Sequence, residues 1–338
     1  MRRTQRLPSL ELRHVRRAVA AVAAAGAAIA LAAMPSAFAQ VYPNRPITLV
    51  VGLTPGSGQD VAARTVSRRA GEILGVQIVV ENKPGAGTMT ASLSVAKAPP
   101  DGYTLLQNGV ALSVNPSLYK QVPYDVTQDF VPVAFLVNAP MILVINPSFA
   151  ATSLGDFMTR YKGSDALTYA HPGAGTMPHL AAELFRVRSG LKIRAVPYRG
   201  GAPALHDVIA NHVGMTMVTP LGKTVIDAGK VRALAVGAEE RLDMVPEIPT
   251  FAEAGLPLPE LNAGAWFGIF APKGTPDDIV RKLNGAFNGA LRDPGVREDL
   301  KALGFVPRTM TTGEFAAFLA DDMKKWPAIV SDAGLRAE

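Results

Sequence analysis

The sequence predicts an α/β fold of two lobes, each a mostly parallel sheet flanked by helices, with a ligand cleft between the lobes. From Ile47 onward, apolar runs alternate with segments of helical spacing, which is typical of parallel α/β sheets. The roughly 300 residues that follow the expected signal exceed what a single core usually holds, which favours two lobes. Finally, the hexapeptide Pro84–Met89 recurs letter for letter as Pro172–Met177, which suggests two walls of one site.

The first 39 residues predict an export signal that is not part of the fold. Six arginines form its basic start: Arg2, Arg3, Arg6, Arg13, Arg16 and Arg17. The uncharged run Ala18–Leu31 follows, and Ala37-Phe38-Ala39 fits a cleavage site before Gln40. That run has 14 residues, short of the roughly 20 that span a bilayer. The arginine pairs leave a twin-arginine route open, but missing flanking residues favour general secretion. We therefore expect a periplasmic mature protein.

The charge of the mature chain argues against nucleic acid as a partner. The whole chain has 34 basic and 28 acidic residues, and the signal removes six arginines and Glu11. The remaining 28 basic and 27 acidic residues include no dense basic stretch with interleaved aromatics. The absence of cysteine excludes disulfides, thiol nucleophiles, lipid anchoring and cysteine-ligated metal. A hydrophobic content of 48% with 18% charged residues predicts a folded chain.

The first α/β unit begins with the apolar run Ile47–Val51, as buried parallel strands do. A helix is expected after the loop at 54–60, with Asp60 as its N-cap or first-turn acid and Gly75 at its end. The cycle then repeats along the chain: strand Gln77–Glu81, the first hexapeptide, a helix to Lys97 and strand Tyr103–Gln107.

A second unit begins after Pro140 with the apolar strand Met141–Ile145, and Ser153 with Asp156 resembles a capping box. Strand Leu167–Ala170 precedes the second hexapeptide, and the helix after it is expected to end near Gly190. The alternation continues as strand Ile193–Val196, helix Ala204–Ile209, strand Met215–Val218, helix Thr224–Ala228 and strand Ala233–Val236.

The C-terminal part predicts helices that return to the first lobe, around Ile279–Leu291, Val296–Leu303 and Glu314–Ile329. This return requires two crossings, which we place near Met141 and between Leu258 and Trp266. The expected organisation is a signal peptide at 1–39, first lobe at 40–141, second lobe at 142–258 and first lobe again at 259–338. Trp266 and Phe267 are expected to pack at the crossing rather than to contact ligand.

Both hexapeptides follow a strand and lead into a helix, which is where a backbone binds anions. Their glycines allow close approach, and the N–H groups at the start of the next helix face a ligand above the turn. The hydroxyl and amide side chains available there are those of Thr54, Ser57, Gln59, Thr88 and Thr176. Two alternatives remain open: the hexapeptides are ordinary turns, and the hydroxyls only cap their own helices.

Catalytic and cofactor motifs are weak. Ser57 lies in Gly56-Ser57-Gly58, which is one residue short of a nucleophile elbow. Thr90 and Pro178 replace the third glycine of a dinucleotide fingerprint, which argues against nucleotide binding. The pairs His171 with His179 and His206 with His212 lack a third ligand at metal spacing. We expect no metal, no cofactor and no enzyme; His179 should be a polar group at a helix start, and His206 and His212 should lie on the surface.

Binding a carboxylate requires only enough hydrogen-bond donors, and not the aligned reactive groups that catalysis requires. Hydrogen bonds to a charged group contribute roughly 1.5 to 3 kcal/mol each, and micromolar affinity requires about 8 kcal/mol, so five or six bonds suffice. Such bonds can also run through water. A third glycine turn, Tyr198-Arg199-Gly200-Gly201, adds Arg199 as a cation, although a solvated arginine is an equally good interpretation.

Many motifs in order resemble one family. They are Tyr42-Pro43-x-Arg45-Pro46, Pro55-Gly56-x-Gly58-x-Asp60, Glu81-Asn82-Lys83-Pro84-Gly85, Pro100-Asp101-Gly102-Tyr103, Asn115-Pro116-x-Leu118-Tyr119, Val196-Pro197-Tyr198-Arg199-Gly200, Ala228-Gly229-Lys230-Val231-Arg232, Ile248-Pro249-Thr250, Trp266-Phe267-Gly268 and Ala271-Pro272-x-Gly274-Thr275-Pro276. The chain is similar in this respect to the tripartite tricarboxylate transporter substrate-binding receptors, also called Bug proteins.

The resemblance implies a monomeric two-lobed periplasmic binding protein (type II-like) that closes on a small carboxylate and delivers it to a membrane permease. Two alternatives remain: a sensory receptor that docks on a membrane sensor kinase, and a periplasmic hydrolase. Departures from the family pattern at Leu53-Thr54-Pro55, Ser57, Gln59 and Thr219 bear on which ligand is bound. The expected ligand-binding residues are Thr54, Gly56, Ser57, Gly58, Gln59, Asp60, Gly85, Ala86, Gly87, Thr88, His171, Gly173, Gly175, Thr176, Tyr198, Gly200 and Thr219.

Overall fold

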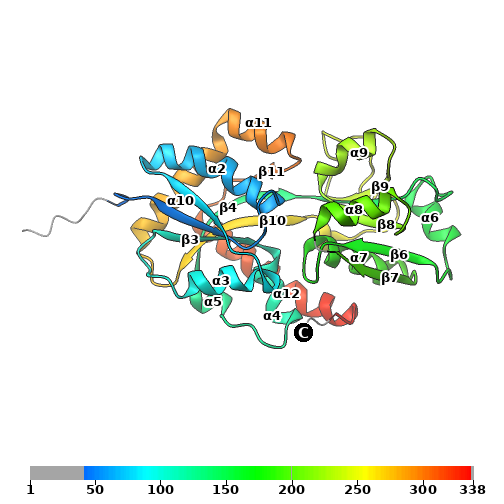
Figure 1. Ribbon diagram of the computed structural model, residues 1–338, viewed down its shortest axis with the longest axis horizontal. Helices are drawn as coiled ribbons and strands as arrows, with labels where there is room; N and C mark the ends of the chain where they lie inside the picture. Colours follow the sequence, from blue (N-terminus) through cyan, green and yellow to red (C-terminus); the bar gives the residue numbers. More distant parts are fainter. Residues whose placement is uncertain (1–41, 199, 336–338) are drawn as a thin grey trace, which may run out of the picture. The chain divides into compact units, whose positions relative to one another are not determined.

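The computed structural model describes residues 42–198 and 200–335, of which those from Pro43 onward form one compact unit. The expected signal peptide, its cleavage site and Arg199 lie outside the described residues. Two β-sheets organise the described chain, with helices around each (Figure 1). This confirms the α/β class with two sheets.

The first sheet has the strand order β11-β4-β10-β3-β1-β2. Its strands are β1 (Ile47–Val51), β2 (Ile78–Asn82), β3 (Thr104–Gly109), β4 (Phe130–Ala139), β10 (Ala265–Pro272) and β11 (Val306–Pro307). β1 pairs in parallel with β2 and β3, whereas β10 runs antiparallel to β3 and β4, and β11 runs antiparallel to β4.

The second sheet has the order β7-β6-β8-β5-β9. Its strands are β5 (Met141–Ile145), β6 (Leu167–His171), β7 (Ile193–Pro197), β8 (Met215–Val218) and β9 (Arg232–Gly237). β6 is parallel to β7 and β8, and β5 is antiparallel to β8 and β9. In each sheet four strands point the same way, so the predicted parallel majority is present; β10 and β11 in the first sheet and β5 in the second run against it, which makes both sheets mixed. The chain leaves the first sheet at the end of β4 and returns to it at the start of β10. These two ends lie at the same edge of the sheet, so β10 runs antiparallel to β4.

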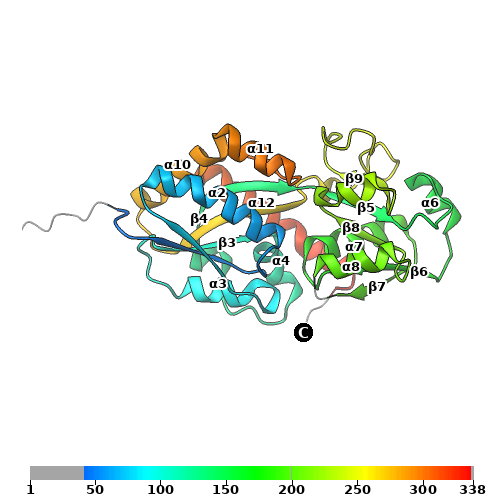
Figure 2. The ribbon, with the colours of Figure 1, turned by 45° about the horizontal axis from the view of Figure 1, so that its top comes forward.

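Helices cover both faces of the first sheet (Figures 1 and 2). The helical segments are α2 (Gly58–Leu74), η1 (Ala86–Thr88), α3 (Met89–Ala96), α4 (Val110–Leu118), α5 (Val126–Asp129), α10 (Asp277–Arg292), α11 (Pro294–Ala302) and α12 (Thr312–Asp332). α2, α10 and α11 lie on one face, and α3, α4 and α5 lie on the other. Helix α2 begins after its N-cap Ser57 and ends at Gly75, whose φ of 73° is left-handed. Gly75 thus ends the helix as predicted, and Asp60 is its first-turn acid.

The second sheet carries α6 (Leu154–Arg160), α7 (Met177–Ser189), α8 (Gly201–Ile209), η2 (Pro220–Gly222), α9 (Lys223–Asp227) and, towards its end, η3 (Pro259–Leu261). Ala204 and Val208 of α8 pack in one buried apolar cluster with Ile142, Val144 and Ala170 of the sheet. Helix α7 ends at Gly190 as predicted, again in the left-handed conformation.

Several elements were absent from the sequence prediction, among them strands β4 and β10 and helix α4, and α4 contacts the candidate site. Strand β4 has ten residues and includes Pro132, which interrupts the strand pattern. Helix α4 includes Pro116 and follows directly on β3 without a polar cap. Propensity and capping signals are therefore poor for α4, and its formation depends on tertiary packing, as the burial of Leu112, Val114 and Leu118 indicates.

The chain passes between the sheets twice. Pro140 alone separates β4 from β5, and the second passage lies between β9 and β10. The two passages touch at Gly264, because a Cβ there would lie 2.3 Å from the carbonyl oxygen of Ala139 and 2.8 Å from Cα of Pro140. The φ of Gly264 is also positive, at 57°. Glycine is thus required at this point by both space and conformation.

A buried polar cluster joins α12 to the first sheet. Oδ2 of Asp322 accepts hydrogen bonds from Ser113 Oγ (2.5 Å), Trp266 Nε1 (3.0 Å) and Trp326 Nε1 (3.1 Å). Trp266 is fully buried there, and Phe267 packs edge-on against Phe305, in line with the expected packing role. In the part of the chain that the structure describes, no helix combines the length and apolar character of a transmembrane span.

Candidate ligand-binding site

The expected site residues follow the carboxyl ends of the parallel strands. In the first sheet, β1 leads into the loop at 52–57, β2 into the first hexapeptide and β3 into α4. In the second sheet, β6 leads into the second hexapeptide, β7 into Tyr198 and β8 into Thr219. Open α/β sheets bind their ligands at this edge.

The loop before α2 is held by a buried carboxylate. Oδ2 of Asp60 accepts a hydrogen bond of 2.9 Å from the Gly56 amide, and Oδ1 accepts one of 2.9 Å from Asn82 Nδ2. Arg64 Nε also donates to Asp60. Burial raises the pKa of the Asp60 carboxyl, but the bonds from Arg64, Gly56 and Asn82 outweigh it and lower the pKa below the ordinary value. Asp60, expected as a ligand residue, thus positions the loop, together with Asn82, which the prediction missed.

The polar side chains at the start of α2 are also used within the protein. Ser57 Oγ accepts from the Asp60 amide at 3.3 Å as a helix cap, while Thr54 is exposed. Gln59 is buried, and its Nε2 donates to the carbonyl of Gln107 at 2.8 Å. The side-chain amide of Gln107 is buried too, with neither atom hydrogen-bonded among the described residues. Sequence analysis missed Gln107 because a lone polar residue in a strand carries no motif.

The first hexapeptide forms a left-handed turn. Its residues Ala86, Gly87 and Thr88 have φ values of 46°, 58° and 72°. Such values are strained for Ala and Thr, so the surrounding contacts must hold them. Asn108 Nδ2 supplies one of these contacts with a 3.0 Å hydrogen bond to Thr88 Oγ1. Another comes from Gly52, where a Cβ would lie 2.6 Å from Cβ of Thr88.

The second hexapeptide leads into α7 with a different backbone. Gly173 and Gly175 have φ values of 140° and 74°, but Thr176 is extended at −73° and is the N-cap residue of α7. Thr176 Oγ1 donates to the carbonyl of Gly173 at 2.7 Å. Both copies thus occupy the strand-to-helix turns that the sequence predicted. Neither threonine hydroxyl caps its helix.

Two buried histidines accept hydrogen bonds from the second turn. Nδ1 of His171 accepts from the Gly173 amide, and Nδ1 of His179 from the Gly175 amide, both at 3.3 Å. The ring centroids are 4.3 Å apart. Burial lowers the pKa of His171, and burial with the neighbouring His171 lowers the pKa of His179 to about 4. His179 lies at a helix start as predicted, but it is a buried acceptor.

The last turn of α4 contacts both hexapeptides. Asn115 Nδ2 donates to the carbonyl of Gly87 at 2.9 Å, and a Cβ on Gly87 would lie 2.6 Å from the hydroxyl of Tyr119. A Cβ on Gly175 would lie 2.6 Å from Leu118 Cδ2 and 3.8 Å from Asn115 Oδ1. Asn115 Oδ1 is buried and has no hydrogen-bond partner among the described residues. The two copies, which follow strands of different sheets, therefore meet at one short segment.

A second contact joins the other loops. A Cβ on Gly304, which lies between α11 and β11, would be 2.3 Å from Cβ of Pro220 in η2. The next residue, Phe305, lies 3.4 Å from the Cβ position of Gly58. The loop containing Gly58 and the turn containing Thr219 are thus linked through Gly304 and Phe305.

The third glycine turn is only partly described, because Arg199 lies outside the described residues. The hydroxyl of Tyr198 donates to Asp207 Oδ2 at 2.5 Å. Desolvation and the Asp207 carboxylate raise the pKa of Tyr198 to about 12. Gly200 precedes α8 with a φ of 128°. Tyr198 thus already has a partner on α8.

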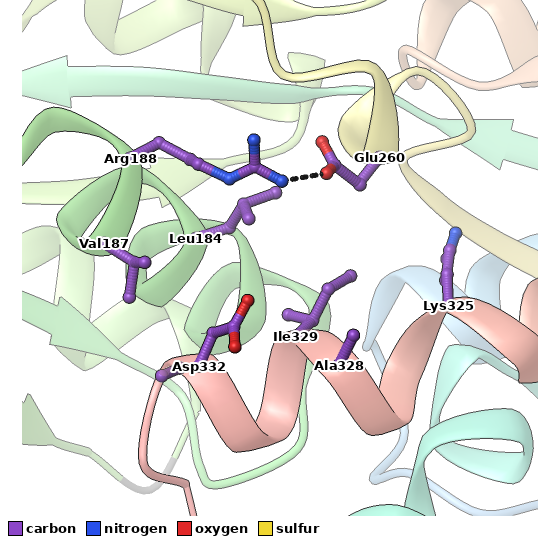
Figure 3. A pocket seen from close by; sticks show the side chains of 9 residues that line it. Leu184, Val187, Arg188, Glu260, Lys325, Ala328, Ile329 and Asp332 are labelled. Atoms are coloured by element: carbon purple, nitrogen blue, oxygen red, sulfur yellow. Dashed lines mark hydrogen bonds and ion pairs between the residues drawn. The ribbon is translucent and has the colours of Figure 1, made fainter.

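Two cavities lie apart from the hexapeptides. A pocket of about 230 Å³ is formed by residues of α7, η3 and α12. Figure 3 shows Arg188 pointing to Glu260 across it, with Lys325 and Asp332 on α12. A carboxylate entering this pocket would meet Glu260 and Asp332 as well as the cations, so it is poorly suited to an anion. A broader hollow of about 660 Å³ lies beside α2 and the edge strand β2.

Metal ligation finds no support in the described residues, where no group of three or more His, Asp or Glu side chains could hold an ion. His206 and His212 are exposed, as predicted. His212 lies 3.4 Å from Asp207 through Nδ1.

Comparison with known proteins agrees with this geometry. Residues 62–335 match the sequence pattern of the tripartite tricarboxylate transporter family receptors. The protein BugT of Bordetella pertussis is 36% identical over 302 residues, which cover 88% of this chain and 92% of BugT.

Two solved structures from Rhodopseudomonas palustris are similar over the whole fold. A protein with bound adipate is 32% identical, with a TM-score of 0.80 over 87% of this chain and 99% of that one. MatC with bound malate is 32% identical, with a TM-score of 0.75 over 86% of this chain and 100% of that one.

Proposed function

Because the chain belongs to the tripartite tricarboxylate transporter receptor family, we propose that it binds a small carboxylate between its two sheets and delivers it to the permease of a tripartite transporter. The family consists of periplasmic solute receptors, not enzymes. The periplasm therefore follows from membership, whereas cleavage of a signal near Ala39–Gln40, a monomeric state and the permease as recipient are part of the proposal.

The observation that carries the proposal is the meeting of the two hexapeptides at the last turn of α4. Gly87 and Gly175 follow strands of different sheets, yet both lie against residues 115–119. Glycine turns with positive φ at the carboxyl ends of strands are suited to hold an anion close to the backbone. The bound adipate and malate of the neighbouring structures support a small carboxylate as the class of ligand.

The buried amides nearby favour a ligand with polar groups on more than one side. Gln107 and Asn115 each have a buried amide atom without a hydrogen-bond partner among the described residues. Buried polar groups are normally paired with protein, water or ligand. We propose that the binding residues include Thr54, Gly56–Asp60, Gly85–Thr88, His171, Gly173, Gly175, Thr176, Tyr198, Gly200 and Thr219, with Asp60 and Gln59 acting through the loop that they hold.

We further propose that the ligand lies between a first lobe at 40–141 and 259–338 and a second lobe at 142–258. The division of the strands between the two sheets supports these lobes, since β1–β4, β10 and β11 form one sheet and β5–β9 form the other.

A thermal-shift screen of the mature chain tests the proposal. The screen would contain mono-, di- and tricarboxylates, aromatic acids and acidic amino acids. A binder at 100 times its Kd stabilises the folded state by about 2.7 kcal/mol, which raises the melting temperature measurably. The expected result is a shift with at least one acid, confirmed by calorimetry. A screen without any shift would contradict carboxylate binding. Capture of membrane proteins by the loaded receptor would then distinguish a permease from a sensor kinase.

A further inference from the structure

The same six residues adopt two backbone conformations in this protein. In the first copy, Ala86, Gly87 and Thr88 are consecutively left-handed, and Thr88 has a φ of 72°. In the second copy, the corresponding Thr176 has a φ of −73° and is the N-cap residue of α7. Because the two hexapeptides are identical, residues outside them must select the conformation.

Among the flanking residues that differ are two whose side chains contact the second turn. The residue before the hexapeptide is Lys83 in the first copy and His171 in the second. The second residue after it is Ala91 in the first copy and His179 in the second. Only the second copy has a side chain that accepts hydrogen bonds at both positions.

The two histidine rings accept hydrogen bonds from backbone amides of the second hexapeptide. Each Nδ1 accepts one amide of the hexapeptide at 3.3 Å, His171 from Gly173 and His179 from Gly175. An amide N–H can only donate, so each Nδ1 must be unprotonated and a neutral ring must carry its proton on Nε2. The rings lie against each other, 4.3 Å apart and both buried, which fixes their orientation.

We propose that His171 and His179 are positioning residues that select the conformation of the second glycine turn, acting as neutral rings protonated on Nε2. The proposal deepens the proposed function, because this turn is one of the two that meet at α4. The affinity measurements below depend on carboxylate binding, whereas the measurement of ring protonation does not.

The charged groups around the pair leave the rings neutral. Tyr169 of β6 packs near both rings, and its hydroxyl donates to Glu183 of α7. Glu183 is also paired with Arg186; its charge raises the pKa of His171, but burial has the larger effect. Burial lowers the pKa of both histidines, that of His179 to about 4. Unlike most histidines, His179 should not change charge between pH 5 and 8, and its bond to the Gly175 amide should persist there.

The protonation state can be measured without a ligand. In the mature chain labelled with 15N histidine, two-bond correlations distinguish the ring nitrogen that carries the proton. We expect two rings, assigned with H171N and H179N, to be neutral and protonated on Nε2, and His179 not to titrate above pH 5. A proton on Nδ1 of either ring, or titration of His179 near the ordinary value of about 6.5, would overturn the proposal.

Matched substitutions test the positioning role. Asparagine places an amide oxygen near the site of Nδ1, whereas glutamine places it near that of Nε2. For malate or adipate, we expect H179N to bind within about threefold of the parent and H179Q to lose on the order of tenfold, equivalent to one hydrogen bond. The exposed His206 provides the control, and H206N should bind as the parent does.

Equal losses in H179N and H179Q would show that the ring only fills space, which would overturn the proposal. If the parent binds neither acid nor any other, the proposed function fails. The ring protonation measured by NMR still decides this proposal in that case, so the two failures are distinguishable.

Discussion

The side-chain amide of Asn115 donates a 2.9 Å hydrogen bond to the carbonyl of Gly87. This bond fixes which end of the amide is the nitrogen, because a carbonyl can only accept. The amide oxygen is thereby directed towards Gly175, whose Cβ position lies 3.8 Å away. One side chain of α4 thus contacts both copies of the repeated hexapeptide.

Replacing Asn115 with aspartate should separate the first turn from α4. The carboxylate has the same shape but cannot donate to Gly87, and it places two oxygens in contact. We expect N115D to lower the free energy of unfolding by about 1 to 3 kcal/mol and to weaken carboxylate binding. Denaturant titration and calorimetry would measure the two effects. Q121E, the same change at an exposed residue, should alter neither; unchanged binding by N115D would refute the role of Asn115.

Alanine at Gly175 should cost more than alanine at Gly190, at the other end of α7. Both glycines are left-handed, with φ values of 74° and 66°. A Cβ at Gly190 meets nothing within 4 Å, whereas one at Gly175 would lie 2.6 Å from Leu118. Both variants should lose about 1 to 2 kcal/mol from the backbone conformation. Only G175A should also lose affinity for malate or adipate. If G190A weakened binding equally, the contact with α4 would be irrelevant.

Acid should destabilise the fold through His179. Its pKa is about 4 in the folded protein, below the value of about 6.5 expected when unfolded. The unfolded chain therefore takes up a proton first as the pH falls. The contribution to stability is complete above pH 6.5 and is lost progressively between 6.5 and 4, by roughly 3 kcal/mol in total. Denaturant titrations at several pH values should show this loss of unfolding free energy in the parent and a smaller loss in H179N. The same dependence of unfolding free energy on pH in both proteins would contradict the prediction.

Removing Asp322 should destabilise the core. D322A removes the acceptor of the Trp266 indole N–H and the ion-pair partner of Lys325, whereas Ser113 keeps its bond to the Val110 carbonyl and Trp326 keeps its bond to Ser113 Oγ. Breaking a buried charged cluster of this kind typically costs about 3 to 5 kcal/mol. The neighbouring D321A removes an exposed carboxylate and should cost less than about 0.5 kcal/mol. Similar melting temperatures for both variants would contradict this account.

Local signals in the sequence predicted the elements that depend on local chemistry. The apolar run Ile47–Val51, the helix that ends at Gly75 and the two strand-to-helix turns all appear in the structure. Helix α4 was missed because Pro116 opposes it, and the direction of β10 was missed because pairing depends on the path of the whole chain.

The same limit applies to the candidate site. Its loops could be located from the repeated hexapeptide and from the family resemblance, but the partners of individual side chains could not. Asp60 and Gln59 stood out as polar residues beside a glycine turn, yet their hydrogen bonds run to Asn82, Arg64 and Gln107 within the protein. Asn115 lies 28 residues from Gly87, and only folding brings the two together.

The passages at Pro140 and Gly264 have a consequence for how tightly this receptor can bind. Proline fixes one of the two free dihedral angles at the first passage, so a rotation of one sheet against the other would depend mainly on the second passage. Apparent affinity equals the intrinsic affinity multiplied by the fraction of molecules in the competent arrangement. Substitutions at residues 140 and 264 would therefore change the apparent Kd for every ligand by one common factor, whereas substitutions in the loops would change the ranking of ligands.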